Sequence, residues 1–282
     1  TAALTINAPT LASVSLSPSS VLGGGSSTGT VTLSSPAPAS GVAVALSSDN
    51  GAAILPASVT VAAGATTANF AVATAGVGAI ISVNVSATFN ATHTTTLTIN
   101  PAVLSTLILN PEEVNGGEVS VGTVTLSGPA PAGGAVVALA SDNAAAPVPV
   151  SVTVAAGATT AAFSVSTGAV FTFTEVNISA SYLGTATATL MIDTAVLWNL
   201  SLNPTAVTGG NSSVGTLTLT GQAPAGGAVV TLSSDNPIVP GIEGVYSSAG
   251  LPQGGSVDWA NLGPAYSSIA SGTVTPVTGL SG

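Results

Sequence analysis

A period of 93 residues runs through this chain and constrains its fold more than any other feature of the sequence. Pro18, Pro111 and Pro204 each follow an apolar run and keep this spacing. Three further prolines and three Asp-Asn pairs keep it as well: Pro38, Pro131 and Pro224, and Asp49-Asn50, Asp142-Asn143 and Asp235-Asn236. A period maintained without insertion indicates one structural unit repeated along the chain.

Each unit has the pattern of short β-strands. In the second copy the predicted strands cover residues 106–110, 122–127, 135–140, 150–154, 161–166, 175–182 and 185–192. The sixth alternates cleanly, with Val176, Ile178, Ala180 and Tyr182 on one face. Seven short strands with period-two alternation and Gly/Pro turns predict an immunoglobulin-like β-sandwich. The expected fold is therefore all-β, with tandem sandwiches forming an elongated rod.

The period also sets the domain boundaries that we expect. Residues 1–9 form an orphan terminal strand, 10–101 form repeat 1 and 102–194 form repeat 2. Residues 195–239 form a partial repeat 3, and 240–282 a divergent segment rich in Gly and Ser.

Composition excludes several classes of partner. The 282 residues include no Lys, no Arg and no Cys, and ten acidic residues give a net charge of -10. Without cations the chain cannot neutralise phosphates, which excludes nucleic acid and disfavours anionic membrane surfaces. No apolar run reaches the 18 residues or so of a membrane-spanning helix. The lack of Cys excludes disulfides and zinc-thiolate sites, and no cofactor is expected.

The repeat sequences resemble a known family. The run LSLNPTAVTGGNSSVGTLTLTGQAPAGGAVVTLSSDNP at 200–237, with VTVAAGATTAAFSV at 152–165, is similar to the bacterial Ig-like repeats of secreted and cell-surface proteins. The resemblance covers residues 10–239. It implies the fold but no particular activity, because such repeats serve as stalks, adhesins, filament subunits and spacers in enzymes.

The two ends of the sequence depart from the repeat in complementary ways. Residues 3–7, Ala-Leu-Thr-Ile-Asn, match the closing strand at 96–100, and the repeat pattern is lost after Val239. One interpretation is that an adjoining copy lies elsewhere in a longer polypeptide. The other is donor-strand complementation, in which Leu4 and Ile6 of one copy complete the third sandwich of the next. Sheet edges without Lys are poorly protected against such pairing.

Acidic residues provide the candidate metal ligands. Asp49, Asp142 and Asp235 recur once per repeat and could bind calcium through their carboxylates. One carboxylate per repeat is too few for a cation site, so turns set by Asp and Asn side chains are favoured. Three more acids, Glu112, Glu113 and Glu118, could form a cation site, but a solvated loop is favoured.

Other candidates for chemistry are sparse. His93 is the single histidine and is expected at the surface, and Glu243 and Asp258 lie in a segment too rich in Gly and Ser to hold a catalytic pair rigidly. Tyr246, Trp259 and Tyr266 are candidates for a small core or interface, or for stacking on sugar rings. Five asparagines begin Asn-x-Ser/Thr glycosylation motifs: Asn84, Asn90, Asn177, Asn199 and Asn211.

These observations predict a non-enzymatic structural protein on the surface of a prokaryote. We expect a subunit of an extracellular filament or surface layer that binds copies of itself. The alternatives are an adhesin that binds surface glycans and a passive stalk of a larger secreted protein.

Overall fold

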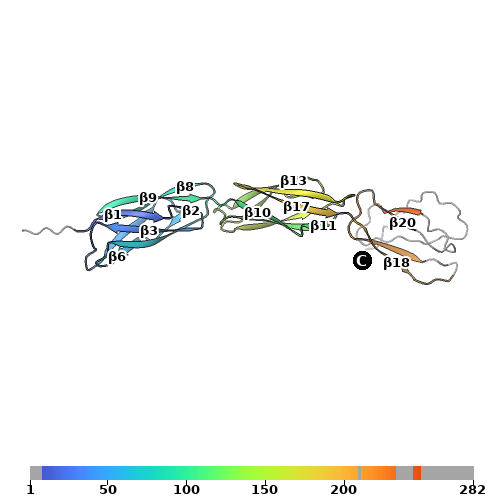
Figure 1. Ribbon diagram of the computed structural model, residues 1–282, viewed down its shortest axis with the longest axis horizontal. Coiled ribbons are helices and arrows are strands. Elements are labelled where there is room, and N and C mark those ends of the chain that lie inside the picture. The colour runs from blue at the N-terminus through green and yellow to red at the C-terminus, as the bar shows by residue number, and fades with distance from the viewer. Residues whose placement is uncertain (1–7, 209–210, 212, 233–243, 249–282) are drawn as a thin grey trace, which may run out of the picture.

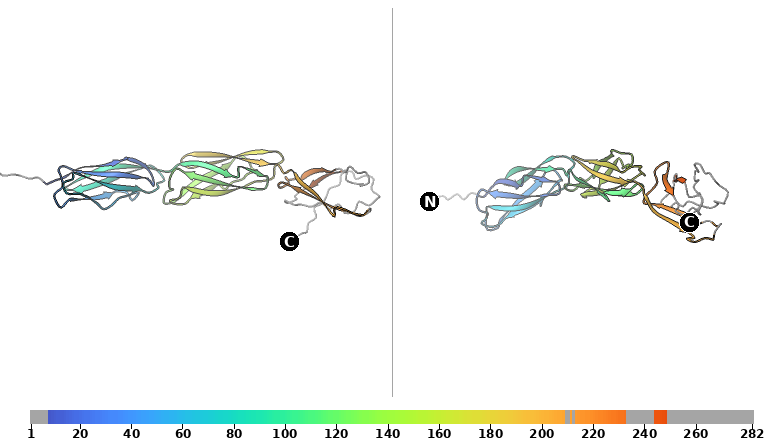
Figure 2. Two further views of the ribbon diagram at one scale, coloured as in Figure 1. Left: turned by 60° about the horizontal axis from the view of Figure 1, so that its bottom comes forward. Right: turned by 45° about the vertical axis from the view of Figure 1, so that its right-hand side comes forward.

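The computed structural model describes residues 8–208, 211, 213–232 and 244–248. All regular secondary structure within these residues is β-strand, and the strands form three units placed end to end (Figure 1). The same row is seen in the two turned views of Figure 2. The predicted all-β rod of tandem sandwiches is confirmed.

Repeat 1 is a complete two-sheet sandwich. Its strands are β1 (Leu11–Ser17), β2 (Ser20–Leu22), β3 (Ser26–Leu33), β4 (Val42–Ser48), β5 (Ala53–Ile54), β6 (Ser58–Val61), β7 (Thr67–Thr74), β8 (Ile81–Phe89) and β9 (Ala91–Asn100). One sheet has the order β1-β3-β7-β5 and the other β2-β9-β8-β4-β6. All neighbours pair antiparallel except β2, which runs parallel to β9.

Repeat 2 has nearly the same topology. Its strands are β10 (Leu104–Asn110), β11 (Glu113–Asn115), β12 (Val119–Leu126), β13 (Ala135–Ser141), β14 (Ser151–Val154), β15 (Thr160–Ser166), β16 (Thr174–Ser181) and β17 (Thr185–Asp193). The sheets are β10-β12-β15 and β11-β17-β16-β13-β14. All seven strands predicted from the sequence are present, and β11 is an eighth that has only three residues.

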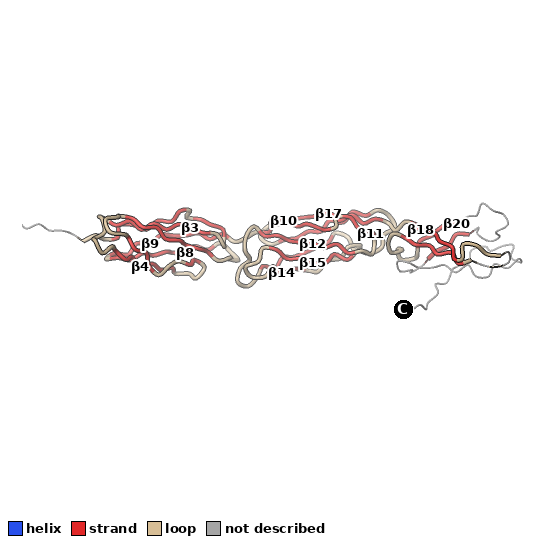
Figure 3. The backbone as a smooth tube through the Cα atoms, turned by 90° about the horizontal axis from the view of Figure 1, so that it is seen from below, coloured by secondary structure: helices blue, strands red, loops and turns tan. Residues whose placement is uncertain are grey.

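Repeat 3 contains four described strands: β18 (Leu197–Asn203), β19 (Val214–Leu219), β20 (Ala228–Leu232) and β21 (Gly244–Ser248). They form two separate pairs, β18-β19 and β20-β21. Figure 3 shows β18 and β20 at the end of the row, beyond repeat 2.

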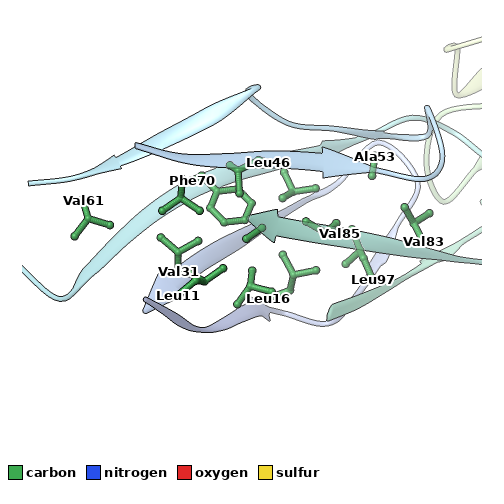
Figure 4. Close-up of a cluster of buried hydrophobic side chains, with 14 of the residues drawn as sticks. Leu11, Leu16, Val31, Leu46, Ala53, Val61, Phe70, Val83, Val85 and Leu97 are labelled. Atoms are coloured by element: carbon green, nitrogen blue, oxygen red, sulfur yellow. The ribbon is translucent and has the colours of Figure 1, made fainter. Parts of the chain in front are cut away.

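Aliphatic side chains that alternate along the strands fill each complete sandwich. Figure 4 shows them gathered between the two sheets of repeat 1. Val83, Val85, Val176 and Ile178 are fully buried, as their alternation predicts. Phe70 packs over Gly29, where an added Cβ would lie 2.1 Å from the ring. Gly29 therefore leaves the space that the buried ring of Phe70 needs.

The recurring prolines mark the point where the chain crosses between sheets. The peptide bond before Pro18, Pro111 and Pro204 is cis. The Ser27 hydroxyl donates a hydrogen bond of 2.7 Å to the Pro18 carbonyl, and Ser120 does the same to Pro111 at 2.6 Å. The hydroxyls of Ser27 and Ser120 therefore fasten the crossing from β1 to β2, and from β10 to β11, to the neighbouring strand.

Glycines allow the repeats to approach closely. An added Cβ at Gly128 would lie 2.7 Å from Leu22 Cδ2, and one at Gly221 would lie 2.9 Å from Asn115 Cβ. Gly128 and Gly221 keep the 93-residue spacing, so both junctions use the same loop. The Gln222 N–H donates to the Gly116 carbonyl at 3.0 Å, which links repeats 2 and 3 directly.

We predict that Ile178→Asp unfolds repeat 2. An unpaired carboxylate would replace a fully buried aliphatic side chain, and the loss of stability should be about 3 kcal/mol or more. Thr187→Asp, at an exposed position on the neighbouring β17, is the matched control and should melt like the parent chain. Thermal melting followed by circular dichroism measures both, and a tolerated Ile178→Asp would mean that the inward face is assigned wrongly.

Candidate functional site

The inner side of β18 differs from the same side of β10. Leu104, Leu107 and Leu109 of β10 are 5%, 7% and 2% exposed. Their counterparts Leu197, Leu200 and Leu202 are 45%, 48% and 52% exposed. Val207 is likewise 46% exposed, whereas its counterpart Val114 is 4% exposed. We call Leu197, Leu200, Leu202 and Val207 the open face of repeat 3.

The closing strands of repeats 1 and 2 explain this difference. β1 lies against β9 and β10 lies against β17, so the final strand of each sandwich covers the leucines of the first. The same strand pairs with β2 or β11 and buries Val21 or Val114. Within the described part of repeat 3, no strand takes the place of β16 or β17. The open face is therefore the surface that a closing strand covers elsewhere in the chain.

Strand pairing in repeat 3 continues beyond Val239. β21 pairs with β20 antiparallel, as β14 pairs with β13. Ala135 is opposite Val154, whereas Ala228 is opposite Ser248, so the register of the pair has moved by one residue. Pairing of sandwich type thus reaches into residues 240–282, although the repeat sequence does not.

The predicted self-assembly residues, Leu4 and Ile6, lie outside the described residues. Their sequence counterparts on β9 are Leu97 and Ile99, and both are fully buried. Leu190 and Ile192 on β17 are buried in the same way. A segment with the pattern of residues 3–7 therefore carries the apolar side chains that a closing strand needs.

Asp49 and Asp142 act as clamps between strands. The Asn84 backbone N–H donates to Asp49 Oδ1 at 2.9 Å, and Asn84 Nδ2 donates to Asp49 Oδ2 at 2.8 Å. Asn177 makes the same two bonds to Asp142, each of 2.9 Å. These donors, the side-chain amide first, hold the pKa of Asp142 below its usual value. The carboxylates thus fasten the end of β4 to β8 and of β13 to β16.

In the described Asp-Asn pairs the asparagine side chain sets a turn, as the sequence predicts. Asn50 Oδ1 accepts a hydrogen bond of 2.9 Å from the Ala52 N–H, which sets the turn after β4, and Asn143 does the same for Ala145. The aspartate contacts a strand 35 residues further on, which the sequence alone did not indicate. Asp235 lies outside the described residues. In the described part of the chain, no three His, Cys, Asp or Glu residues lie together as metal ligands.

Glu112, Glu113 and Glu118 are all exposed to solvent, as expected, but Glu113 lies in a strand and not in a loop. This residue belongs to β11, where it faces Met191 of β17. A hydrogen bond with Asp193, and the proximity of that carboxylate's charge, raise the pKa of Glu113. Glu118 instead accepts a hydrogen bond of 3.1 Å from the Asn115 N–H in its own loop. Glu113 and Glu118 therefore serve separate local contacts.

The remaining candidates are scattered. His93 is half-buried rather than fully on the surface, because it stands opposite the buried Ala87 at the β8–β9 hairpin. The glycosylation candidates are all exposed: Asn84, Asn90, Asn177, Asn199 and Asn211. Tyr246 belongs to β21, and Glu243, Asp258, Trp259 and Tyr266 lie outside the described residues.

Sequence reasoning missed Trp198, which is 73% exposed at the start of β18. Its counterparts 93 and 186 residues earlier are Ser105 and Ala12. The signal that could have found it is this replacement of a small residue by a tryptophan at an outward position of the repeat.

Comparison with known proteins gives likenesses of fold. No family model matches the chain, and no curated protein matches it. The D0-D1 domain of intimin is 14% identical, with 65% of this chain and 99% of that one covered and a TM-score of 0.28. The adhesin InvE of Yersinia pseudotuberculosis is 15% identical, with 74% of this chain and 67% of that one covered and a TM-score of 0.35.

Part of the chain of an enzyme matches to a similar degree. A glycosyl hydrolase family 2 member from Bacteroides cellulosilyticus is 16% identical, with 61% of this chain and 23% of that one covered and a TM-score of 0.26. Matches of this size carry no argument about what the chain does. The fold class rests on the strand order of the chain's own sheets. The described residues include no helix with the length and hydropathy of a membrane span.

We predict opposite pH effects for Asp142→Asn and Glu113→Gln. The lowered pKa of Asp142 stabilises the fold above the carboxyl's unfolded pKa, and this is lost as the pH falls through the folded pKa. Asp142→Asn should therefore melt earlier than the parent near neutral pH and converge with it in acid. The raised pKa of Glu113 gives a contribution that is lost as the pH rises, so Glu113→Gln should melt later near neutral pH.

Melting curves between about pH 2 and about pH 7 test this pair of variants. Addition of calcium or of EDTA is the control and should leave the parent curve unchanged. A parent melting temperature that falls in EDTA, or Asp142→Asn curves that match the parent at every pH, would contradict the clamp.

Proposed function

We propose that the chain is a structural subunit of an extracellular filament or surface layer of a prokaryote, and that its copies join head to tail. The open face of repeat 3 is the observation that carries this proposal. Four aliphatic side chains are about half-exposed there, while their counterparts in repeat 2 are buried under a closing strand. A large apolar surface of this kind is unusual in a protein that stays monomeric.

The proposed occupant is the segment 3–7 of a second copy. Leu4 and Ile6 would take the places that Leu97 and Ile99 hold over β1, or Leu190 and Ile192 over β10. Covering four half-exposed aliphatic side chains contributes on the order of 4 kcal/mol, and the added strand supplies a ladder of main-chain hydrogen bonds. A contact between different surfaces of identical subunits does not close on itself and generates a fibre.

The shape of the molecule and its composition support the same role. The repeats form a row with the same glycine loop at each junction, which suits a filament or a layer. The chain has no Lys or Arg, so it has no cleavage site for trypsin-like proteases, and this favours an exposed location. A passive stalk would use the same rod, but it would have no need for the open face.

We predict that removal of residues 1–9 abolishes assembly. The full chain should form fibres visible by negative-stain electron microscopy, and the shortened chain should stay monomeric by light scattering. Leu200→Asp with Leu202→Asp in the full chain should have the same effect, because the two substitutions place charge on the open face of repeat 3. The matched control is Leu4→Val with Ile6→Val, which keeps the apolar pattern and should still assemble.

A synthetic peptide of residues 1–12 should stop growth of existing fibres, while the same peptide with Leu4→Asp and Ile6→Asp should not. If the shortened chain polymerises like the parent, residues 1–9 are not the donor. If the full chain remains monomeric at all concentrations, the stalk is the better description.

A further inference from the structure

Trp198 occupies an irregularity in β18 that turns it outward. Leu197 is opposite Leu219 and Asn199 is opposite Thr218, so the pairing skips Trp198. The same irregularity occurs in β10, where both residues at the bulge, Ser105 and Thr106, are exposed. Trp198 and Asn199 therefore lie together on the outer side of β18, away from the open face.

The sandwich does not need an aromatic residue at this place. Ala12 and Ser105 stand at the equivalent positions in complete repeats. A tryptophan is among the largest apolar groups in proteins, with about 150–250 Å² to bury, and this one is 73% exposed. Its indole face is therefore left free for a ligand, and its N–H for a hydrogen-bond acceptor.

Apart from Val196, which is 56% exposed, the described residues that surround Trp198 on this side are polar and uncharged. Across the outer side of this strand pair, Asn199 is opposite Thr218 and Ser201 is opposite Thr216. Residues 194–232 include no Asp, Glu, Lys or Arg. Among the described residues of repeat 3, the surface thus combines one flat apolar ring with neutral amide and hydroxyl groups, and these residues carry no charge to select an ionic ligand.

We infer that the outer face of β18 and β19 binds neutral carbohydrate, with Trp198 as the stacking platform. A pyranose ring offers an apolar C–H face to the indole and hydroxyls to Asn199, Ser201, Thr216 and Thr218. In a protein–protein interface, a tryptophan that dominates binding would instead be surrounded by tightly packed contacts that exclude water. The inference does not depend on head-to-tail assembly, since the opposite side of β18 carries the open face.

The test uses the full chain and three soluble probes: cellohexaose, chitohexaose and maltohexaose. Titration calorimetry should show binding of at least one of them. Trp198→Ser, which restores the residue of repeat 2, should weaken that binding at least about tenfold. Trp198→Phe should retain part of it, and Phe171→Ser, which removes a 71% exposed aromatic ring from repeat 2, should leave it unchanged. Equal melting curves for Trp198→Ser and the parent would show that the fold is intact.

A second variant rebuilds the surface in repeat 2, whose β12 already carries Thr123 and Thr125 at the positions of Thr216 and Thr218. Ser105→Trp with Thr106→Asn and Ile108→Ser should add one binding site per chain. The inference is overturned if none of the probes binds, or if Trp198→Ser binds as tightly as the parent. Loss of self-assembly in Trp198→Ser without any glycan binding would also overturn it, and would assign Trp198 to a protein contact.

Discussion

The contact between the first and the last strand of each sandwich is the interaction on which the rest of this structure depends. The core consists of Val, Leu, Ile and Ala with one buried phenylalanine ring per complete repeat, so it is thin and depends on the contribution of each strand. Where β9 and β17 cover β1 and β10, six residues from these first strands are buried: Leu11, Val14, Leu16, Leu104, Leu107 and Leu109. Where the described chain has no such cover, in repeat 3, the same positions are exposed.

Neutral hydrogen bonds and isolated carboxylates replace ion pairs in holding the strands together. With no Lys or Arg, the chain cannot form the surface salt bridges that most proteins carry. Asp49 and Asp142 instead bind the amide groups of Asn84 and Asn177, and the hydroxyls of Ser27 and Ser120 bind proline carbonyls. Hydrogen bonds to a charged group are stronger than neutral ones, so a single carboxylate per repeat can fix the pairing of two strands.

Repeat 3 presents two different surfaces on the two sides of one strand. The inner side of β18 is aliphatic and fits a closing strand, and the outer side places a tryptophan among small polar groups. Alternation along a β-strand separates these surfaces by one residue in the sequence and by the thickness of the sheet in space. Self-association and ligand binding can therefore be altered independently.

The sequence by itself determined the period, the seven main strands of repeat 2 and their inward faces, because alternation and turn residues act locally. It could not indicate β11, whose three residues are too short to alternate and which forms only by pairing with β17. It could not assign Asp49 to Asn84, since the two are 35 residues apart and meet only when β4 lies beside β8. Only the tertiary structure decided that Leu200 and Leu202 are exposed, because the burial of a strand depends on a partner strand distant in the sequence.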